Sequence, residues 1–178
     1  MVRGAVAVLS AVLFALPALA GQDSKSSELA KQLGQLLDQK KMDSFAAADA
    51  QNAGVFVAAL YYPGTELLVV SAKHFNPPVM ADKLDKKQFQ DAYAELNAGA
   101  TAGTKLLVMD TFADGLSAKP GNGNAPDSID GTTSTTFDGN WKKAKQTEED
   151  YMKVFQAADT AYAHALEVLL AKLKGSGT

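Results

Sequence analysis

The sequence predicts an α+β fold in which an antiparallel sheet of about five strands is packed by two or three helices. Two apolar runs joined by a Pro-Gly pair predict a hairpin, and two segments with helical apolar spacing lie towards the ends of the chain. Further short β-rich runs stand between them. Strands that are grouped between helices, rather than alternating with them, are typical of an α+β domain.

The first helix is predicted over residues 24–48. Ser24 is a candidate N-cap, because a serine oxygen can accept a hydrogen bond from a free backbone N–H of the first turn. An apolar stripe with helical spacing follows at Leu29, Leu33, Leu36 and Leu37. Met42 and Phe45 continue this stripe, and we therefore expect the helix to reach residue 48.

The hairpin is predicted from residues 55–62 (VFVAALYY) and 66–72 (ELLVVSA), which Pro63-Gly64 separates. Proline presets φ at one turn position and glycine accepts a positive φ at the next. Neither run alternates cleanly between apolar and polar residues. We therefore expect both faces of the hairpin to be covered and the hairpin to lie centrally in the sheet.

The segment 82–97 supports two alternative predictions. Asp82 is a candidate helix cap, and apolar residues then recur at helical spacing up to Leu96. The letters FQDAYAEL also alternate loosely, so a short helix ending near Gln88 and a strand over 88–97 is the alternative.

Three more strands and one long loop are predicted in the second half of the chain. We expect a strand at 106–112 (LLVMDTF), a short strand at 116–119 and an edge strand at 132–137 (TTSTTF). Residues 120–131 (PGNGNAPDSIDG) are rich in glycine, proline and asparagine, which predicts a flexible loop.

The last helix is predicted to begin at Thr147, because Thr-Glu-Glu-Asp is similar to a capping box and places acids at the positive end of the helix dipole. One face carries large apolar residues, namely Phe155, Tyr162, Leu166, Leu169 and Leu173. Another face carries smaller residues and a histidine: Ala157, Ala161, His164, Val168 and Ala171. Two apolar faces predict burial between two layers, and the second face is alternatively the seam of a homodimer.

The order of these elements resembles the arrangement of profilin and roadblock-type domains. If residues 88–97 form a strand, the order instead resembles a small split barrel of the kind that holds a flavin in other proteins. Both resemblances concern element order alone, and no sequence motif accompanies them.

The N-terminus predicts an export signal. Arg3 precedes an uncharged run from Gly4 to Ala20, which Pro17 interrupts and which ends in the small-residue pattern A-x-A. We expect cleavage after Ala20, a periplasmic or extracellular location, and a single mature domain over residues 21–178 with its flexible loop at 120–131. An uncleaved membrane anchor is the alternative.

Composition excludes several classes of function. The 178 residues contain no cysteine, which excludes thiol nucleophiles, disulfides and zinc–thiolate sites. The formal charge is −3 and Arg3 is the only arginine. Because bidentate contacts with phosphate and guanine are arginine chemistry, we expect no nucleic-acid partner. We expect contact with a membrane only through the export signal.

Catalytic and metal-binding patterns are missing from the sequence. It contains no G-x-S-x-G, S-x-x-K or H-E-x-x-H, and only two histidines. Asp127, Asp130 and Asp138 do not have the spacing of a calcium loop. We therefore expect no catalytic residue, no metal and no cofactor.

The weak ligand-binding candidates are Lys73, His74, Lys105 and Trp141, and the weak interface candidates are Ala157, Ala161, His164 and Val168. The predicted function is an exported, non-catalytic domain that binds a protein or a small ligand and that can form a homodimer. A flavin-type binder on a split barrel, with its phosphate on Lys73 and Lys105, is the alternative. A hydrolase that uses His74 is a third hypothesis.

Overall fold

The structure is a computed structural model, and it describes residues 24–73, 105–120, 125–130, 134–143 and 145–175. Helices begin and end the described part, and strands lie between them. Their order is α1 (Lys25–Lys40), β1 (Ser44–Ala48), β2 (Val55–Tyr62), β3 (Glu66–Lys73), β4 (Lys105–Thr111), β5 (Ser128–Asp130), β6 (Thr135–Thr136) and α4 (Glu148–Gly175). The alternatives for residues 82–97 and the predicted export signal lie outside the described residues.

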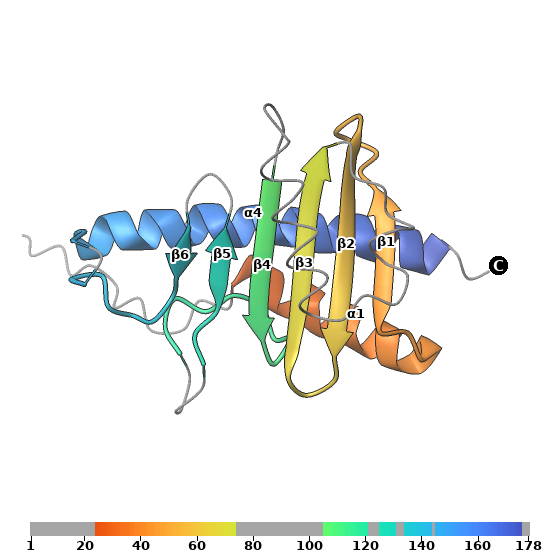
Figure 1. Cartoon of the computed structure of the whole chain (residues 1–178), viewed down its shortest axis with the longest axis horizontal. Helices are drawn as coiled ribbons and strands as arrows, with labels where there is room; N and C mark the ends of the chain where they lie inside the picture. The colour runs from red at the N-terminus through yellow and green to blue at the C-terminus, as the bar shows by residue number, and fades with distance from the viewer. Residues whose placement is uncertain (1–23, 74–104, 121–124, 131–133, 144, 176–178) are drawn as a thin grey trace, which may run out of the picture.

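The six strands form one antiparallel open sheet in the order β1-β2-β3-β4-β5-β6, so that each strand pairs with its neighbour along the chain. Both helices lie on one face of this sheet, and α4 crosses behind the strands and runs on past β1 (Figure 1). The α+β prediction is confirmed. The described sheet has six strands instead of about five, and it is open. The split-barrel alternative depends on a strand at 88–97, which lies outside the described residues.

The two faces of the sheet carry separate apolar clusters. The face towards the helices includes Val57, Val69 and Val108, which pack with leucines and aromatic residues of α1 and α4. The other face has a smaller buried cluster at Ala58, Leu60, Leu68, Val70 and Ala72. The predicted hairpin is confirmed as β2 and β3, central in the sheet and buried on both faces. Gly64 takes φ +69 in the turn between them.

The first helix is shorter than predicted, and a strand follows it. α1 ends at Lys40, where Lys41 adopts a left-handed conformation (φ 54) and its N–H reaches the carbonyl of Asp38. Residues 44–48 then pair with β2 in five successive positions. Phe45 and Ala47 therefore reach the core from a strand instead of from a continued helix. The predicted helix over 24–48 is wrong beyond residue 40.

The region after β4 also differs from the prediction. Residues 116–119, predicted as a short strand, contain no strand. Residues 128–130, predicted as part of the loop 120–131, form β5, which pairs with Val108 and its two neighbours in β4. Burial of Ile129 (7% exposed) accounts for this strand, because it extends the core face of the sheet. Within the predicted edge strand at 132–137, Thr135–Thr136 form β6. Residues 134 and 137 lie outside the strand, and 132–133 lie outside the described residues.

The last helix begins as predicted. The hydroxyl of Thr147 accepts a hydrogen bond from the Asp150 N–H and donates one to its carboxylate. The large apolar face is buried, but the smaller face is not: Ala157, Ala161 and Ala171 are exposed, and His164 and Val168 are half-buried. Burial between two layers is therefore wrong for the described structure, because α4 covers the sheet as an outer layer (Figure 1).

The first turn of α1 is capped by the other helix. Ser24 makes no side-chain cap hydrogen bond. Instead, the buried carboxylate of Asp159 in α4 accepts hydrogen bonds from the backbone N–H groups of Lys25 (2.7 Å) and Ser26 (3.1 Å). The Ser26 hydroxyl also donates to Asp159 (2.7 Å) and accepts from the Leu116 N–H (2.9 Å). One carboxylate thus joins both helices and, through Ser26, the segment after β4.

Candidate functional site

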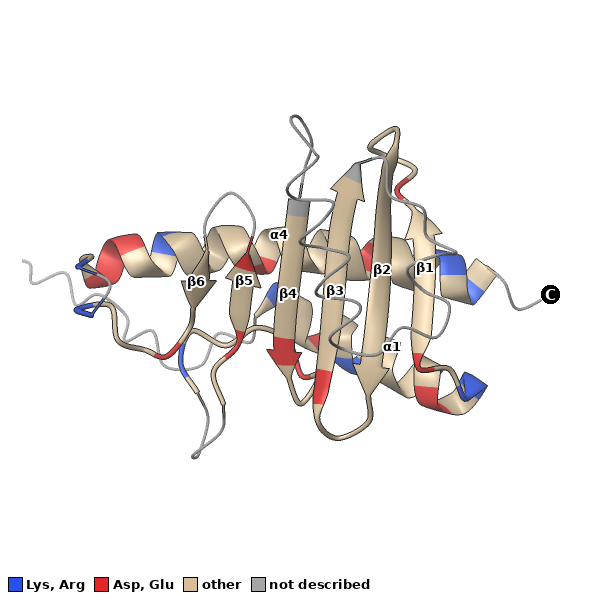
Figure 2. Cartoon of the chain, in the orientation of Figure 1, with Lys and Arg blue, Asp and Glu red and all other residues tan. Residues whose placement is uncertain are grey.

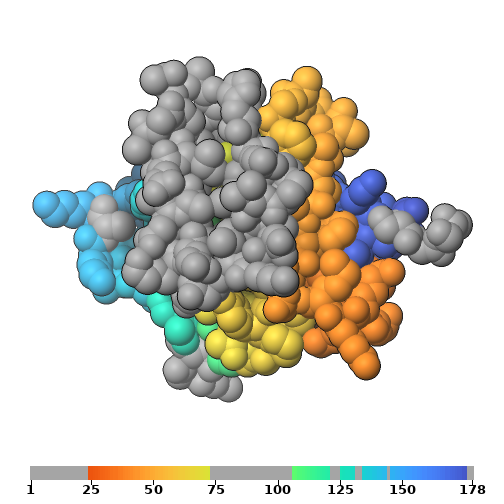
Figure 3. Space-filling view, turned by 45° about the vertical axis from the view of Figure 1, so that its right-hand side comes forward, coloured from red at the N-terminus to blue at the C-terminus, as the bar shows by residue number. Residues whose placement is uncertain are grey.

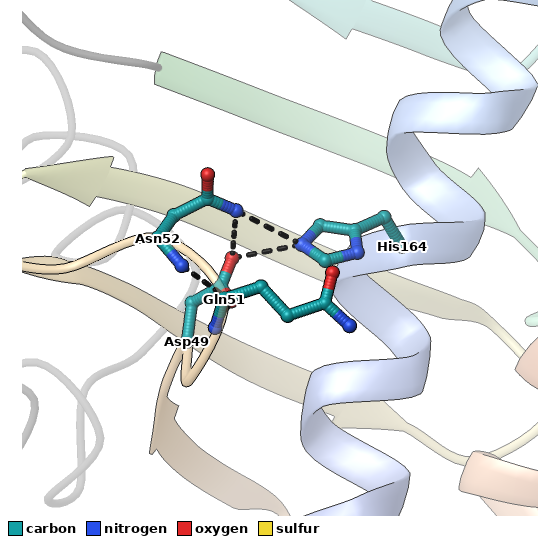
Figure 4. A network of polar contacts seen from close by, with 4 residues as sticks. All are labelled: Asp49, Gln51, Asn52 and His164. Atoms are coloured by element: carbon teal, nitrogen blue, oxygen red, sulfur yellow. Dashed lines mark hydrogen bonds and ion pairs between the residues drawn. The ribbon is translucent and has the colours of Figure 1, made fainter.

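The most site-like polar cluster joins the β1–β2 turn to the middle of α4. Asp49 follows β1 directly, and its Oδ2 lies 2.8 Å from Nε2 of His164 (Figure 4). The Asp49 side chain is 2% exposed and the His164 side chain 35% exposed. A buried carboxylate therefore holds an imidazole whose ring still reaches solvent.

The turn is shaped around the Asp49 side chain. Its Oδ1 accepts the backbone N–H groups of Gln51 (2.8 Å) and Asn52 (3.2 Å), and its Oδ2 accepts the Asn52 side-chain amide (2.8 Å). The Asp49 N–H donates to the Val55 carbonyl (2.9 Å) and closes the hairpin. An aspartate that accepts backbone N–H groups two and three residues later is ordinary turn chemistry.

Burial and hydrogen bonding act in opposite directions on the pKa of Asp49. Burial by itself raises the pKa of Asp49, but hydrogen bonds from Asn52, His164 and Gln51 outweigh burial and lower the pKa to about 2. The carboxylate is an acceptor, so Nε2 of His164 carries the hydrogen that it receives. The Asn52 Nδ2, 3.4 Å from Nε2, already donates to the same carboxylate. Nδ1 of His164 is therefore the ring nitrogen that does not contact Asp49.

A carboxylate that orients an imidazole is also the supporting part of a nucleophilic triad. In the described part of the chain, however, no serine or threonine hydroxyl is hydrogen-bonded to His164. The cluster consists of a turn, its acceptor and a histidine. These residues form a polar cluster at the α4 surface that the β1–β2 turn holds in place. They do not by themselves supply a nucleophile.

We expect Asp49→Ala to destabilise the fold by about 2 kcal/mol, because the backbone N–H groups of Gln51 and Asn52 lose their acceptor. His164→Gln should cost no more than about 1 kcal/mol, because that side chain is partly exposed and makes fewer contacts. Urea unfolding of the two variants checks both values. Asp43→Ala, at the other end of β1, is the control. Equal stability of Asp49→Ala and the wild-type protein would contradict this role.

A second group of carboxylates lies deep in the fold. Asp110 at the end of β4 is fully buried, and it accepts the hydroxyl of Tyr162 (2.8 Å) and the N–H groups of Gly115 (2.9 Å) and Asp114 (3.1 Å). Burial raises the pKa of Asp110 to about 7. These hydrogen bonds tie the turn after β4 to α4. Because no part of this carboxylate reaches solvent, it is not placed to contact a ligand.

Asp127 has a similar role beside it. Its two oxygens accept the N–H groups of Thr111 (2.8 Å) and Ser117 (2.8 Å), so it holds both ends of the turn that follows β4. Burial raises the pKa of Asp127 to about 6, and the hydrogen bonds from these N–H groups act in the opposite direction. Both aspartates are therefore structural acceptors with raised pKa values.

A shallow pocket of about 280 Å³ lies on the sheet face away from the helices, over β4 to β6. Its floor is apolar at Leu107 and Met109, and its rim is formed by hydroxyl-bearing residues of β5 and β6 with Asp130. The Ser134 hydroxyl is hydrogen-bonded to the Asp130 carboxylate. None of the described residues that line the pocket carries a positive charge that could hold a phosphate, and the pocket is smaller than most ligand sites.

The predicted ligand-binding residues are only partly placed by the structure. Lys73 ends β3 and Lys105 begins β4, and the pairing of Ala72 with Lys105 brings their backbones close together. Their side chains and all of His74 lie outside the described residues. Trp141 is half-buried and packs against the core cluster, with the Lys142 ammonium 5.1 Å from its ring centre. The described contacts of Trp141 are therefore packing contacts.

The predicted interface residues are better defined. Ala157, Ala161, His164 and Val168 lie along one exposed or half-buried face of α4. The sequence does not predict that Asp49 supports His164, because the two residues are 115 positions apart. The one local signal is an aspartate followed by an asparagine and a glycine after β1, which is typical of a turn.

The described residues contain neither a metal-binding cluster nor a membrane-spanning helix. Groups of three or more histidine, aspartate and glutamate side chains with the geometry of a metal site are not found there. Nor does any helix in that part of the chain combine the length and the apolar run needed to cross a bilayer. Comparisons with protein-family models, with curated proteins and with solved structures found no match.

Proposed function

We propose that the protein is an exported, non-catalytic interaction domain and that it forms a homodimer through the exposed face of α4. The observation that carries this proposal is the spacing of that face. Val154, Ala157, Ala161, His164, Val168 and Ala171 follow each other at intervals of three, four, three, four and three residues. That is the apolar repeat of helices that pack side by side along a seam.

The exposure of the seam favours a partner over a purely structural role. Ala157, Ala161 and Ala171 are exposed, and the opposite face of α4 already supplies the core. Small side chains let two helix backbones approach closely. An apolar repeat that is exposed over several turns is unusual on a helix without a partner.

A second copy of the chain is the partner that the pattern favours. In an antiparallel pair centred on His164, Ala157 lies opposite the second copy's Ala171 and Ala161 lies opposite its Val168. The seam is thus complementary to itself about a two-fold axis, as a homodimer interface must be. At its centre, each His164 is held by its own Asp49 (2.8 Å), which fixes both rings before association.

The non-catalytic part of the proposal rests on the composition of the His164 cluster. The groups around the imidazole are a carboxylate and an amide, and both are already used in the β1–β2 turn. The export part rests on the uncharged run from Gly4 to Ala20 and on its A-x-A ending. The flavin alternative depends on a strand at 88–97, which lies outside the described residues, and no observation supports it.

We expect the purified protein to be a dimer by light scattering coupled to size exclusion, and we expect Ala161→Glu to convert it to a monomer. On association, a glutamate at position 161 of each copy would be buried against small apolar groups of the other copy. Its charge would then lose water without gaining a partner. Gln156→Glu is the matched control, because it adds the same charge to an exposed position of α4 away from the seam. A wild-type protein that stays monomeric throughout the micromolar range would overturn the dimer.

A further inference from the structure

The free edge of the sheet at β1 offers a second interaction surface, independent of the α4 seam. The register shows which backbone groups of β1 face β2 and which face the free edge. The Tyr61 N–H donates to the Asp43 carbonyl (2.8 Å), and the Asp49 N–H donates to the Val55 carbonyl (2.9 Å). Backbone groups that face the partner strand alternate along an antiparallel pair. Phe45 and Ala47 therefore point their N–H and C=O groups at β2.

The groups that point outward belong to Ser44, Ala46 and Ala48. β1 has only β2 as a neighbour in the sheet, and within the described part of the chain no partner is recorded for the outward backbone groups of these three residues. In Figure 3 the orange atoms of this segment lie at the surface, between the β1–β2 turn and the C-terminal part of α1. The edge thus presents three N–H and three C=O groups in strand geometry.

Natural sheets protect such edges, and the five residues of β1 do not themselves supply the usual devices. Lysine, proline and β-bulges are the common devices that prevent another strand from pairing. β1 has the sequence SFAAA, and its register with β2 is unbroken from Ser44 to Ala48. Apart from Phe45, its side chains are those of serine and alanine. The described residues of β1 therefore carry none of these protective devices.

The surroundings indicate what kind of segment fits. α4 runs on past β1 on the helix face (Figure 1), so two-fold pairing of two β1 edges would bring both α4 ends into the same space. A single extended segment avoids this collision. Exposed lysines lie at the ends of α1 and α4 around this edge (Figure 2): Lys40, Lys41, Lys172 and Lys174. Of the nearby acids, Asp38 accepts the Tyr61 hydroxyl and Asp43 that of Ser44.

We propose that the β1 edge docks an extended segment of a partner polypeptide, flanked by acidic residues, which adds to the sheet as a further strand. The backbone groups of Ser44, Ala46 and Ala48 hold its main chain. Alternate side chains of the added strand face the projecting end of α4, and the flanking acids lie near the lysines. Main-chain hydrogen bonds supply affinity in this mode, and the lysines select for acidic flanks.

The test uses a short fluorescent peptide in which threonine and valine alternate between terminal glutamates. We expect its anisotropy to rise on addition of the protein. Two control peptides separate the contributions: one has the same sequence with alternate backbone nitrogens methylated, and the other has lysine in place of glutamate. Both should bind at least about ten-fold more weakly, because each loses either main-chain hydrogen bonds or charge complementarity.

The matched protein variant is Ala46→Pro. It removes an outward N–H and leaves the β1–β2 hydrogen bonds intact, so we expect an unchanged circular dichroism spectrum and about ten-fold weaker binding. Ala46→Ser is the control that keeps the N–H. Equal binding of the methylated peptide would show contact with surface charge only and would overturn the proposal. Absence of binding at millimolar peptide would overturn it as well, as would loss of peptide binding in Ala161→Glu, whose β1 edge is unchanged.

Discussion

Gly115→Ala should destabilise the protein by at least about 3 kcal/mol, which combines a left-handed backbone penalty with overpacking. Gly115 has φ +93, a value that residues with a side chain rarely adopt. A Cβ at this position would lie 2.3 Å from the Ser27 Cα and 2.5 Å from its nitrogen. Those atoms belong to the backbone of α1, so they cannot move aside as a flexible side chain could. Urea unfolding measures the loss.

Gly64→Ala is the matched control for this prediction. Gly64 also has a positive φ (+69), but a Cβ there would have no atom within 4 Å. Only the backbone penalty then remains, about 1 kcal/mol. Similar losses for the two variants would mean that conformation alone matters, and they would contradict the close packing of Gly115 on α1.

The free energy of unfolding should fall as the pH rises from about 4 to about 7, because burial raises the pKa of Asp110 to about 7 and that of Asp127 to about 6. In this range the folded state keeps protons that the unfolded state, with its usual pKa of 3.8, has lost. Stability therefore decreases with pH, by about 1.4 kcal/mol for each unit of pKa shift. Urea unfolding at several pH values measures the slope.

The contribution of Asp49 to the free energy of unfolding changes in the opposite direction, and it does so at lower pH. Its pKa of about 2 means that its contribution is present above pH 3.8 and is lost as the pH falls towards 2. The three groups together place the stability maximum near about pH 4. Asp110→Asn should flatten the slope above this maximum, even though the variant is less stable at every pH. An unchanged slope in that variant would exclude Asp110 as its source.

The sequence predicts the fold class because its strongest signals are long or local. The central hairpin combines two apolar runs with a Pro-Gly turn, and α4 combines a capping box with an extended apolar face. The sequence does not predict β1, because SFAAA has the composition of a helix and because the C-cap of α1 is Lys41 and not a glycine. Only the pairing with β2 makes these residues a strand, and pairing is a tertiary interaction that propensity does not include.

The candidate site was predictable only in part. The exposed stripe of α4 follows from spacing along one element, and the sequence therefore identifies His164 as one of its members. Its partner Asp49 comes from a turn 115 positions earlier, and only folding brings the two together. The raised pKa values of Asp110 and Asp127 also depend on burial by distant residues such as Tyr162. The burial of these two aspartates leaves no local pattern in the sequence.

The capping of α1 by Asp159 has a consequence for how the protein folds. Each strand of the sheet pairs with its neighbour along the chain, and the β1–β2 and β2–β3 connections are short, so these three strands can assemble through short loop closures. The two helices, in contrast, are joined by contacts such as that between Lys25 and Asp159, which are 134 positions apart. Closing so long a loop is slow and is rewarded only when both helices meet. We expect a newly made chain to keep its core face open to water until its last helix has been delivered, so that completion of the fold waits for the end of synthesis.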